Sequence, residues 1–255
     1  MIRGVLCDLV GVLYEGHTVQ PGAHAALAAL ERAGLVVRYL TNTTRSPCTA
    51  ILARLQALGF RVGPEALFTA PRAVHDHLLA RGLEPLLITH PDLAPEFADL
   101  PPTGRRCVVI GDPGEAADYA SLNAAFRLLK SGAPLIAMGR NRYFQEDGAL
   151  SLDMGPFVAL LEYAAEIEAC VLGKPAPAFF EAALAGTGLA PHETVMIGDD
   201  VEADVLGAVA AGMRGILVRT GKYRAGDERR LGRGALCVAD VGEAVREILT
   251  ARDTR

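Results

Sequence analysis

Short apolar segments alternate with longer amphipathic segments along this chain, and that alternation constrains the fold more than any other feature. The N-terminal part predicts a strand at "RGVLCDL", a helix at "GAHAALAALERAGL", a strand at "VVRYLTN" and a helix at "SPCTAILARLQALGF". The pattern resumes near the C-terminus with "ACVLGKP", "PAFFEAALAGTGL", "TVMIGDD", "VEADVLGAVAAGM" and "RGILVRTGKY". Strands separated by helices of this length pair in parallel, so the sequence predicts a layered α/β sheet.

A second set of alternating segments occupies the middle of the chain. It comprises "PLLITH", "CVVIGD", "SLNAAFRLLKSG", "PLIAMG" and "GPFVALLEYAAEI". A length of 255 residues leaves room for one large domain or two modest ones. The middle set predicts a small domain of its own.

Composition and charge exclude several classes of protein. A formal net charge of −5, with "DERRLGRG" as the one short basic stretch, argues against a nucleic-acid partner. No stretch approaches eighteen apolar residues, and the apolar run at the N-terminus is too short for a signal peptide, so we expect no membrane partner. The five cysteines form no CxxC pair, which favours reduced thiols and a cytoplasmic protein.

Polar residues follow the predicted strands at the carboxyl ends, where parallel sheets bind their ligands. Carboxylates are hard oxygen ligands for Mg²⁺, lysine and hydroxyl groups stabilise phosphate, and a carboxylate can attack phosphorus to form an aspartyl-phosphate. Each residue alone fits an ordinary turn or helix cap, but together they predict a site that handles phosphoryl groups. The set is Asp8, Thr41, Asn42, Lys174, Asp199 and Asp200.

The segments "DLVGVLY", "LTNTT", "GKPAP" and "GDDVEAD" resemble, in this order, the four motifs of the haloacid dehalogenase (HAD) superfamily of phosphohydrolases. The long interval between Thr41 and Lys174 resembles the branch with an α/β cap inserted between the second and third motifs. The resemblance implies a HAD-like Rossmannoid core with a parallel sheet over residues 1–75 and 170–255, and a smaller cap domain over residues 76–169. Within the superfamily, "GVLY", "LTN", "LDMGPF" and "IGDD" are similar to segments of the group that contains phospholysine phosphohistidine inorganic pyrophosphate phosphatase and the HAD-like hydrolase domain-containing proteins.

The resemblance implies a Mg²⁺ site and a nucleophile. Asp8 is expected to be the nucleophile and a metal ligand, with the backbone carbonyl of Val10 and the carboxylate of Asp199 as further ligands. Asp200 and Asp204 are expected to support these ligands rather than to touch the metal.

The same resemblance implies how a small phosphorylated substrate is held. Thr41 and the amide of Asn42 are expected to bind the transferring phosphoryl group. Lys174 is expected to pair with Asp8 and with the phosphate, whose charge must be neutralised before a carboxylate can approach it.

Val10 departs from the family pattern. Family phosphatases usually carry an aspartate there, which protonates the leaving group and later activates water, and losing such a group costs about 10² to 10⁴ in rate. Relatives with serine at this position are still regarded as phosphatases. We therefore expect a slow phosphatase that favours good leaving groups, as in acyl phosphates, N-phosphorylated side chains, pyrophosphate and aryl phosphates.

Val10 also leaves other functions open. One is a catalytically impaired member that binds a phosphorylated ligand or a protein through its cap. Dehalogenases and phosphonate hydrolases of the superfamily also lack this aspartate. Dehalogenation needs no metal, so Asp199 argues against it, and phosphonate cleavage needs a cap lysine, for which Lys130 is the one residue between Thr41 and Lys174.

The cap is expected to recognise the substrate through the polar segment "GRNRYFQEDGALSLDMGPF", with Arg140, Arg142 and Tyr143 as candidates. An ordinary solvated loop is the competing interpretation of this segment. The resemblance also carries the expectation of a homodimer formed through the cap, although no stripe of residues in the cap identifies such a surface.

Overall fold

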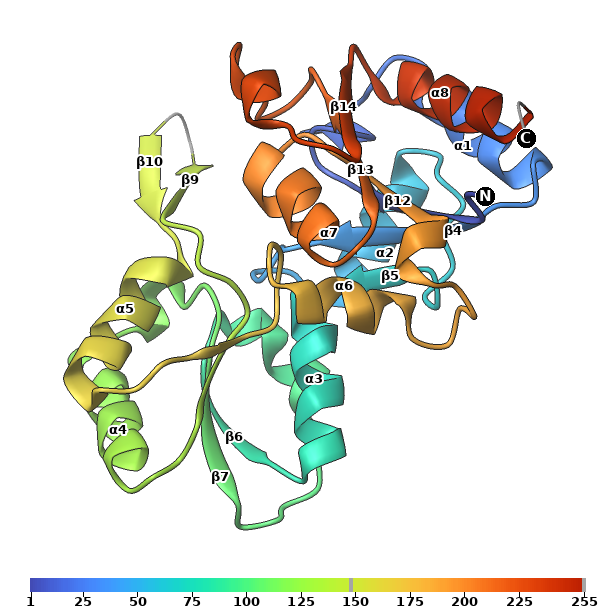
Figure 1. Cartoon of the computed structure of the whole chain (residues 1–255). Helices are drawn as coiled ribbons and strands as arrows, with labels where there is room; N and C mark the ends of the chain where they lie inside the picture. Colours follow the sequence, from blue (N-terminus) through green and yellow to red (C-terminus); the bar gives the residue numbers. More distant parts are fainter. Residues whose placement is uncertain (147–148, 254–255) are drawn as a thin grey trace. The chain divides into compact units, whose positions relative to one another are not determined.

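The computed structural model describes residues 1–146 and 149–253 (Figure 1). The chain forms two compact units. The first consists of Met1–Thr41, Leu52–Phe68 and Lys174–Arg255, and the second of Asn42–Ile51 and Thr69–Gly173. Each unit has its own parallel sheet and its own helices, as the α/β class predicts.

The first unit is built on a six-stranded sheet with β1 near its centre. The strand order is β14 (Ala235–Val238), β13 (Arg214–Val218), β12 (Thr194–Gly198), β1 (Gly4–Asp8), β4 (Val36–Thr41) and β5 (Leu67–Thr69). The pairs from β14 to β4 are parallel. Every residue of β1 and of β12 is buried, which explains why both strands are continuous apolar runs rather than alternating ones.

The helices of the first unit pack their apolar faces on this sheet and on one another. In α1 (Ala23–Arg32) the buried residues Ala23, Ala26 and Leu30 recur at the helical period, and α1 packs against α8 (Val241–Asp253). The unit also contains α2 (Cys48–Ala57), whose first turn belongs to the second unit, α6 (Pro177–Leu184), a π-helical turn (Val201–Leu206), α7 (Gly207–Ala210), 3-10 helices at Pro191–Glu193 and Asp227–Arg230, and the small hairpin of β2 (Tyr14–Glu15) and β3 (Thr18–Val19).

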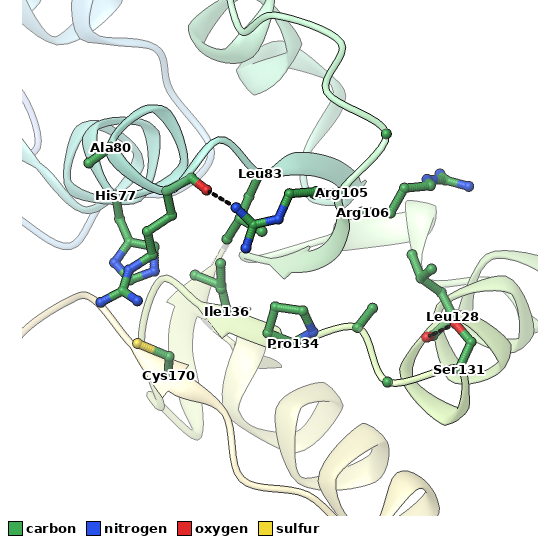
Figure 2. A pocket seen from close by; sticks show the side chains of 14 residues that line it. His77, Ala80, Leu83, Arg105, Arg106, Leu128, Ser131, Pro134, Ile136 and Cys170 are labelled. Carbon is green, nitrogen blue, oxygen red and sulfur yellow. Dashed lines mark hydrogen bonds between the residues drawn. The ribbon is translucent and has the colours of Figure 1, made fainter.

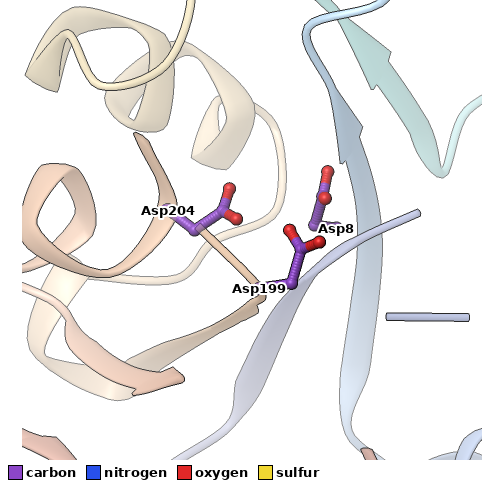
Figure 3. A group of neighbouring side chains, drawn as sticks. All are labelled: Asp8, Asp199 and Asp204. Atoms are coloured by element: carbon purple, nitrogen blue, oxygen red, sulfur yellow. The ribbon is translucent and has the colours of Figure 1, made fainter. Parts of the chain in front are cut away.

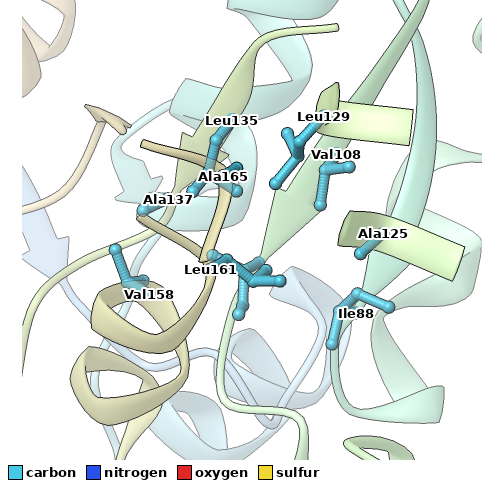
Figure 4. Packing of buried hydrophobic residues seen from close by; sticks show 10 residues of the cluster. Ile88, Val108, Ala125, Leu129, Leu135, Ala137, Val158, Leu161 and Ala165 are labelled. Atoms are coloured by element: carbon cyan, nitrogen blue, oxygen red, sulfur yellow. The ribbon is translucent and has the colours of Figure 1, made fainter. Parts of the chain in front are cut away.

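The second unit has a four-stranded parallel sheet in the order β11 (Cys170–Val171), β8 (Leu135–Ala137), β7 (Arg106–Ile110) and β6 (Glu84–Ile88). Its helices are α3 (Ala70–Arg81), α4 (Tyr119–Lys130) and α5 (Met154–Ala165), and β9 (Tyr143–Glu146) pairs with β10 (Ala149–Leu152) as an antiparallel hairpin. Figure 4 shows how Val108 and Leu135 from the sheet meet Leu129 of α4 and Leu161 of α5 in one apolar core. This unit therefore has the core of a small domain of its own.

The structure differs from the sequence prediction at the strand before Lys174. Cys170 and Val171 pair with β8 in the second unit, whereas the sequence assigned them to the core. The reason is that this strand has two residues, too few to show which sheet it joins. Among the described helices, none combines the length and the apolar character needed to span a membrane.

Candidate active site

The topology of the first unit gathers the predicted residues at one edge of its sheet. In β1, Asp8 is the last residue, and β1 lies between β4 and β12. Asp8 is in register with Leu40, so Thr41 extends one residue beyond it, and Asp199 directly follows β12. Parallel strands end together, and three of the predicted side chains are therefore neighbours although they are far apart in the sequence.

Lys174 connects two carboxylates at this edge. Its Nζ donates a hydrogen bond of 2.6 Å to Oδ1 of Asp8 and another of 2.6 Å to Oδ1 of Asp204. Burial lowers the pKa of Lys174, but the charges of Asp204 and Asp8 outweigh it, and the net result is a pKa above the usual range for lysine. The lysine is therefore a permanent cation, and it leaves Oδ2 of Asp8 without a hydrogen bond from any described residue.

Asp199 is held by a loop that follows β13. The backbone N–H of Lys222 donates a hydrogen bond of 2.7 Å to Oδ2 of Asp199. Gly11 and Gly221 have positive φ angles of 85° and 58°, and a Cβ on either one would overlap that same oxygen. Two loops thus close on Oδ2 of Asp199, and Oδ1 is the oxygen left for a ligand.

Asp204 is brought to Lys174 by the turn that follows Asp200. The carboxylate of Asp200 accepts hydrogen bonds of 3.0 Å from the N–H groups of Glu202 and Ala203, which starts the π-helical turn. The N–H of Asp200 in turn donates to Oδ2 of Asp204. Both oxygens of Asp204 therefore have partners, whereas the carboxylate of Asp200 caps the turn and lies 3.8 Å from Nζ of Lys222.

Three buried carboxylates face one another at this site. Asp8, Asp199 and Asp204 each offer an oxygen, and these oxygens lie within 4.8 Å of one another (Figure 3). Burial raises the pKa of Asp199 well above the usual range for a carboxyl group, and the negative charges of Asp8 and Asp204 raise it further. Burial also raises the pKa of Asp204, against the lowering effect of Lys174. Such crowding is costly without a compensating cation, which makes the donor set suitable for a hard divalent metal.

The loop after β1 adds a carbonyl oxygen to this donor set. The bridge between Val10 and Tyr14 is made by the carbonyl of Leu9 and the N–H of Gly11, so it does not use the carbonyl of Val10. No described residue donates a hydrogen bond to that carbonyl. Val10 as a whole is 44% exposed. The residues present therefore fit a divalent cation held by Asp8, Asp199 and the Val10 carbonyl.

The remaining predicted residues lie at the boundary between units or in the second unit. Thr41 is buried at the end of β4, and Asn42 is the first residue of the second unit. Arg140 forms an ion pair with Glu162 through two hydrogen bonds, and the first residue of β9 is the exposed Tyr143.

Arg142 is also exposed and precedes β9, where its backbone carbonyl accepts a hydrogen bond from the N–H of Asp153. Residues 147–148 of the predicted recognition segment lie outside the described residues.

Sequence reasoning missed two contacts of this site. The pairing of Lys174 with Asp204 was not expected, because nothing in "GDDVEAD" shows which of its acidic residues turns inward. The Lys222 amide and Gly221 were also missed, although "TGKY" follows a predicted strand and the same strand-end argument could have identified it.

Family models match two parts of the chain. A model described as haloacid dehalogenase-like hydrolase matches residues 5–125, and one described as HAD-hydrolase-like matches residues 171–244. Together they include every residue of the carboxylate site described above.

Similar proteins cover nearly the whole chain. Haloacid dehalogenase-like hydrolase domain-containing protein 2 of Bos taurus is 44% identical over 90% of this chain and 89% of its own length. Phospholysine phosphohistidine inorganic pyrophosphate phosphatase of Danio rerio is 40% identical over 98% of this chain and 96% of its own. A solved structure of 4-nitrophenylphosphatase from Thermotoga maritima has a TM-score of 0.86 and 23% identity over 96% of this chain and 97% of that one.

Proposed function

The chain belongs to the haloacid dehalogenase-like hydrolase family, and from this premise we propose that it is a Mg²⁺-dependent phosphatase that works through an aspartyl-phosphate on Asp8. The observation that carries the proposal is the buried contact of 2.6 Å between Nζ of Lys174 and Oδ1 of Asp8, next to Asp199. A carboxylate fixed by a permanent cation at a metal-suited cluster is the arrangement that nucleophilic attack on a phosphate requires.

The metal would be held by the carboxylates of Asp8 and Asp199 and by the backbone carbonyl of Val10. When bound, Mg²⁺ supplies positive charge that reduces the repulsion between a phosphate dianion and the Asp8 carboxylate. Lys174 supplies a second positive charge from the protein itself, and Asp204 holds it in place.

The proposed reaction has two displacements at phosphorus. In the first, an oxygen of Asp8 forms a bond to phosphorus while the bond from phosphorus to the leaving group breaks, and the leaving group departs with the electron pair. Thr41 and Asn42 are proposed to hold the phosphoryl group in line during this step. In the second, a water oxygen forms a bond to phosphorus while the bond from phosphorus to Asp8 breaks and its electron pair restores the carboxylate; the proton of the water passes to solvent and inorganic phosphate leaves.

Val10 determines which leaving groups are suitable. An isopropyl side chain neither donates nor accepts a proton, so the leaving group must depart without help. Pyrophosphate satisfies this condition, and so does phosphorylated nitrogen once the nitrogen has taken a proton from solvent and can leave as a neutral amine. Both groups occur in the name of the relative that is 40% identical to this chain. We therefore propose P–N and P–O–P bonds as the preferred substrates.

The second unit is proposed to select the substrate through Arg140, Arg142 and Tyr143. The ion pair with Glu162 fixes the orientation of Arg140, and Arg142 and Tyr143 are exposed. A homodimer and a cytoplasmic location also remain predictions.

A second candidate function is binding of a phosphorylated ligand without turnover. Val10 supports it, since the residue that normally assists both steps is replaced by an inert side chain. The phosphate-release experiment described next separates the two functions.

The test is phosphate release with and without Mg²⁺ on pyrophosphate, an aryl phosphate, acetyl phosphate and a sugar phosphate. We expect release with the first three that requires Mg²⁺ and is abolished in Asp8→Asn. Release that survives in Asp8→Asn would exclude the proposed nucleophile, and no release from any substrate would favour the binding function.

A further inference from the structure

The second unit contains a cavity of about 970 Å³ that shares no residue with the carboxylate site. It lies where the strands of this unit begin: Leu83 precedes β6, Arg106 starts β7, Pro134 precedes β8 and Cys170 starts β11. Its volume is in the range of cavities that hold small organic ligands. All of its lining residues belong to the second unit, so it is a feature of that unit alone.

The charged residues that line this cavity are all cationic. They are Arg81 at the end of α3, Arg105 directly before β7 and Arg106 at its start. His77 also lines the cavity, and burial together with the charge of Arg81 lowers its pKa. The guanidinium of Arg105 donates a hydrogen bond of 2.8 Å to the carbonyl of Arg81, which fixes it over the cavity (Figure 2).

The guanidinium groups of Arg81 and Arg106 have no hydrogen bond or ion pair with any described residue. Three arginines line the cavity, and a guanidinium group is matched best by an anion such as phosphate or carboxylate, which can accept two of its N–H groups at once.

No carboxylate lines the cavity to neutralise these groups. Glu84 does not line the cavity, although its Oε2 accepts a hydrogen bond of 3.0 Å from the backbone N–H of the lining residue Gly104. Glu166 pairs with Lys130, and neither residue lines the cavity. The cavity is therefore positively charged, which excludes a metal ion or an organic cation as its ligand.

The middle of the cavity is apolar. Ile136 and Leu83 are almost completely buried, and Leu128 and Pro134 extend the same wall. In Figure 2, Ile136 and Pro134 lie between the end marked by Cys170 and the end marked by Leu128. An inorganic anion alone would leave this wall without a partner, whereas an organic ligand would cover it.

We propose that this cavity binds a small organic polyanion. Its phosphate or carboxylate groups bond to Arg81, Arg105 and Arg106, and its apolar part packs on Ile136 and Pro134. This binding does not depend on the proposed phosphatase reaction, because none of these residues takes part in it.

The location of the ligand can be tested through Cys170, an exposed thiol that lines the cavity. ATP serves as the probe, with tripolyphosphate as the charge-only control and adenosine as the apolar control, all in EDTA to prevent turnover. The rate of Cys170 modification by N-ethylmaleimide is read by peptide mass spectrometry. At an ATP concentration of about ten times the dissociation constant of ATP, we expect the modification of Cys170 to be about tenfold slower, since ATP and N-ethylmaleimide compete for the cavity.

Cys237, which lies in the first unit, should react at an unchanged rate. Adenosine and tripolyphosphate should each protect Cys170 much less than ATP. Equal protection by tripolyphosphate would overturn the organic part of the proposal, and no protection by millimolar ATP would overturn the site itself.

In the double variant Arg81→Gln/Arg106→Gln, the ATP concentration needed to protect Cys170 to the same extent should rise about a hundredfold, because two charge-assisted contacts are lost. Arg127→Gln is the matched control, since Arg127 is exposed on α4 and does not line the cavity. Protection that persists in the double variant, with both variants folded by circular dichroism, would place the probe elsewhere and refute the proposal.

Discussion

Nζ of Lys174 donates a hydrogen bond of 2.6 Å to Oδ1 of Asp204, and both side chains are almost completely buried. The same Nζ also binds Asp8, so the lysine charge is shared between the proposed nucleophile at the end of β1 and Asp204 in the π-helical turn. Asp204 fixes the position of Lys174 independently of any substrate. This pair therefore links the stability of the first unit to the geometry of the proposed chemistry.

Asp204→Ala should destabilise the first unit by about 3 to 5 kcal/mol, because it leaves part of a buried lysine charge without its partner. The free energy of unfolding is measured in urea without added metal. Glu202→Ala is the control, since Glu202 lies on the same turn but pairs with Arg230 in solvent, where an ion pair contributes less than about 1 kcal/mol. Equal effects of the two variants would contradict the structural role of Asp204.

Gly221→Ala should weaken Mg²⁺ binding, because a methyl group at this position would overlap Oδ2 of Asp199 and lie 2.5 Å from Cα of Gly11. The Mg²⁺ concentration that gives half-maximal activity should rise by about tenfold or more, as expected when a support of a metal ligand is lost. Gly16→Ala is a matched control, since Gly16 has a similar positive φ of 54° but no atom near its added Cβ.

Gly16→Ala should show the cost of backbone strain alone, about 1 kcal/mol in stability, with unchanged Mg²⁺ dependence. A similar change in Mg²⁺ dependence in both variants would mean that strain in the loops, rather than contact with Asp199, controls the metal site.

The structure explains which parts of this site could be predicted from sequence. Asp8, Thr41 and Asp199 each end or follow a strand of the first sheet, so pattern and topology are sufficient to bring them together. Lys174 was selected by the same rule, but the strand before it belongs to the sheet of the second unit. The topology of the first sheet therefore does not account for its position at the site, and the resemblance to the family motifs is what identified it.

The contacts of Asp204 and Lys222 could not be predicted in this way. The inward position of Asp204 depends on a π-helical turn, and a pattern based on 3.6 residues per turn does not distinguish that turn from an ordinary helix. The contact of Lys222 uses its backbone N–H, which is independent of side-chain type and leaves little sequence signal.

The stability of the metal-free protein should fall as the pH rises through the neutral range. Burial, together with the charges of Asp8 and Asp204, raises the pKa of Asp199 above its value in the unfolded chain. The folded protein then holds a proton that the unfolded chain has already released, so the free energy of unfolding decreases with rising pH above about pH 4.

Asp199→Asn removes this titration, and the comparison isolates it from other groups. In EDTA, wild type should lose stability relative to Asp199→Asn between about pH 5 and pH 8, and added Mg²⁺ should cancel the loss because the cation replaces the proton. Parallel pH profiles for the two proteins in EDTA would show that Asp199 is ionised in the folded state at all these pH values.

Val10→Asp should convert the protein into a faster phosphatase for poor leaving groups. Val10 is 44% exposed in the loop after β1, so an aspartate fits there without displacing core residues. A carboxyl group at this position can protonate an alkoxide, which is worth about 10²-fold or more in rate, whereas a leaving group of low pKa gains little. The ratio of kcat for an alkyl phosphate to kcat for an aryl phosphate should therefore rise by about two orders of magnitude. Val10→Asn provides a side chain of the same size without the acid and should leave the ratio unchanged. If Val10→Asp also leaves it unchanged, departure of the leaving group does not limit turnover, and the preference for good leaving groups must come from binding instead.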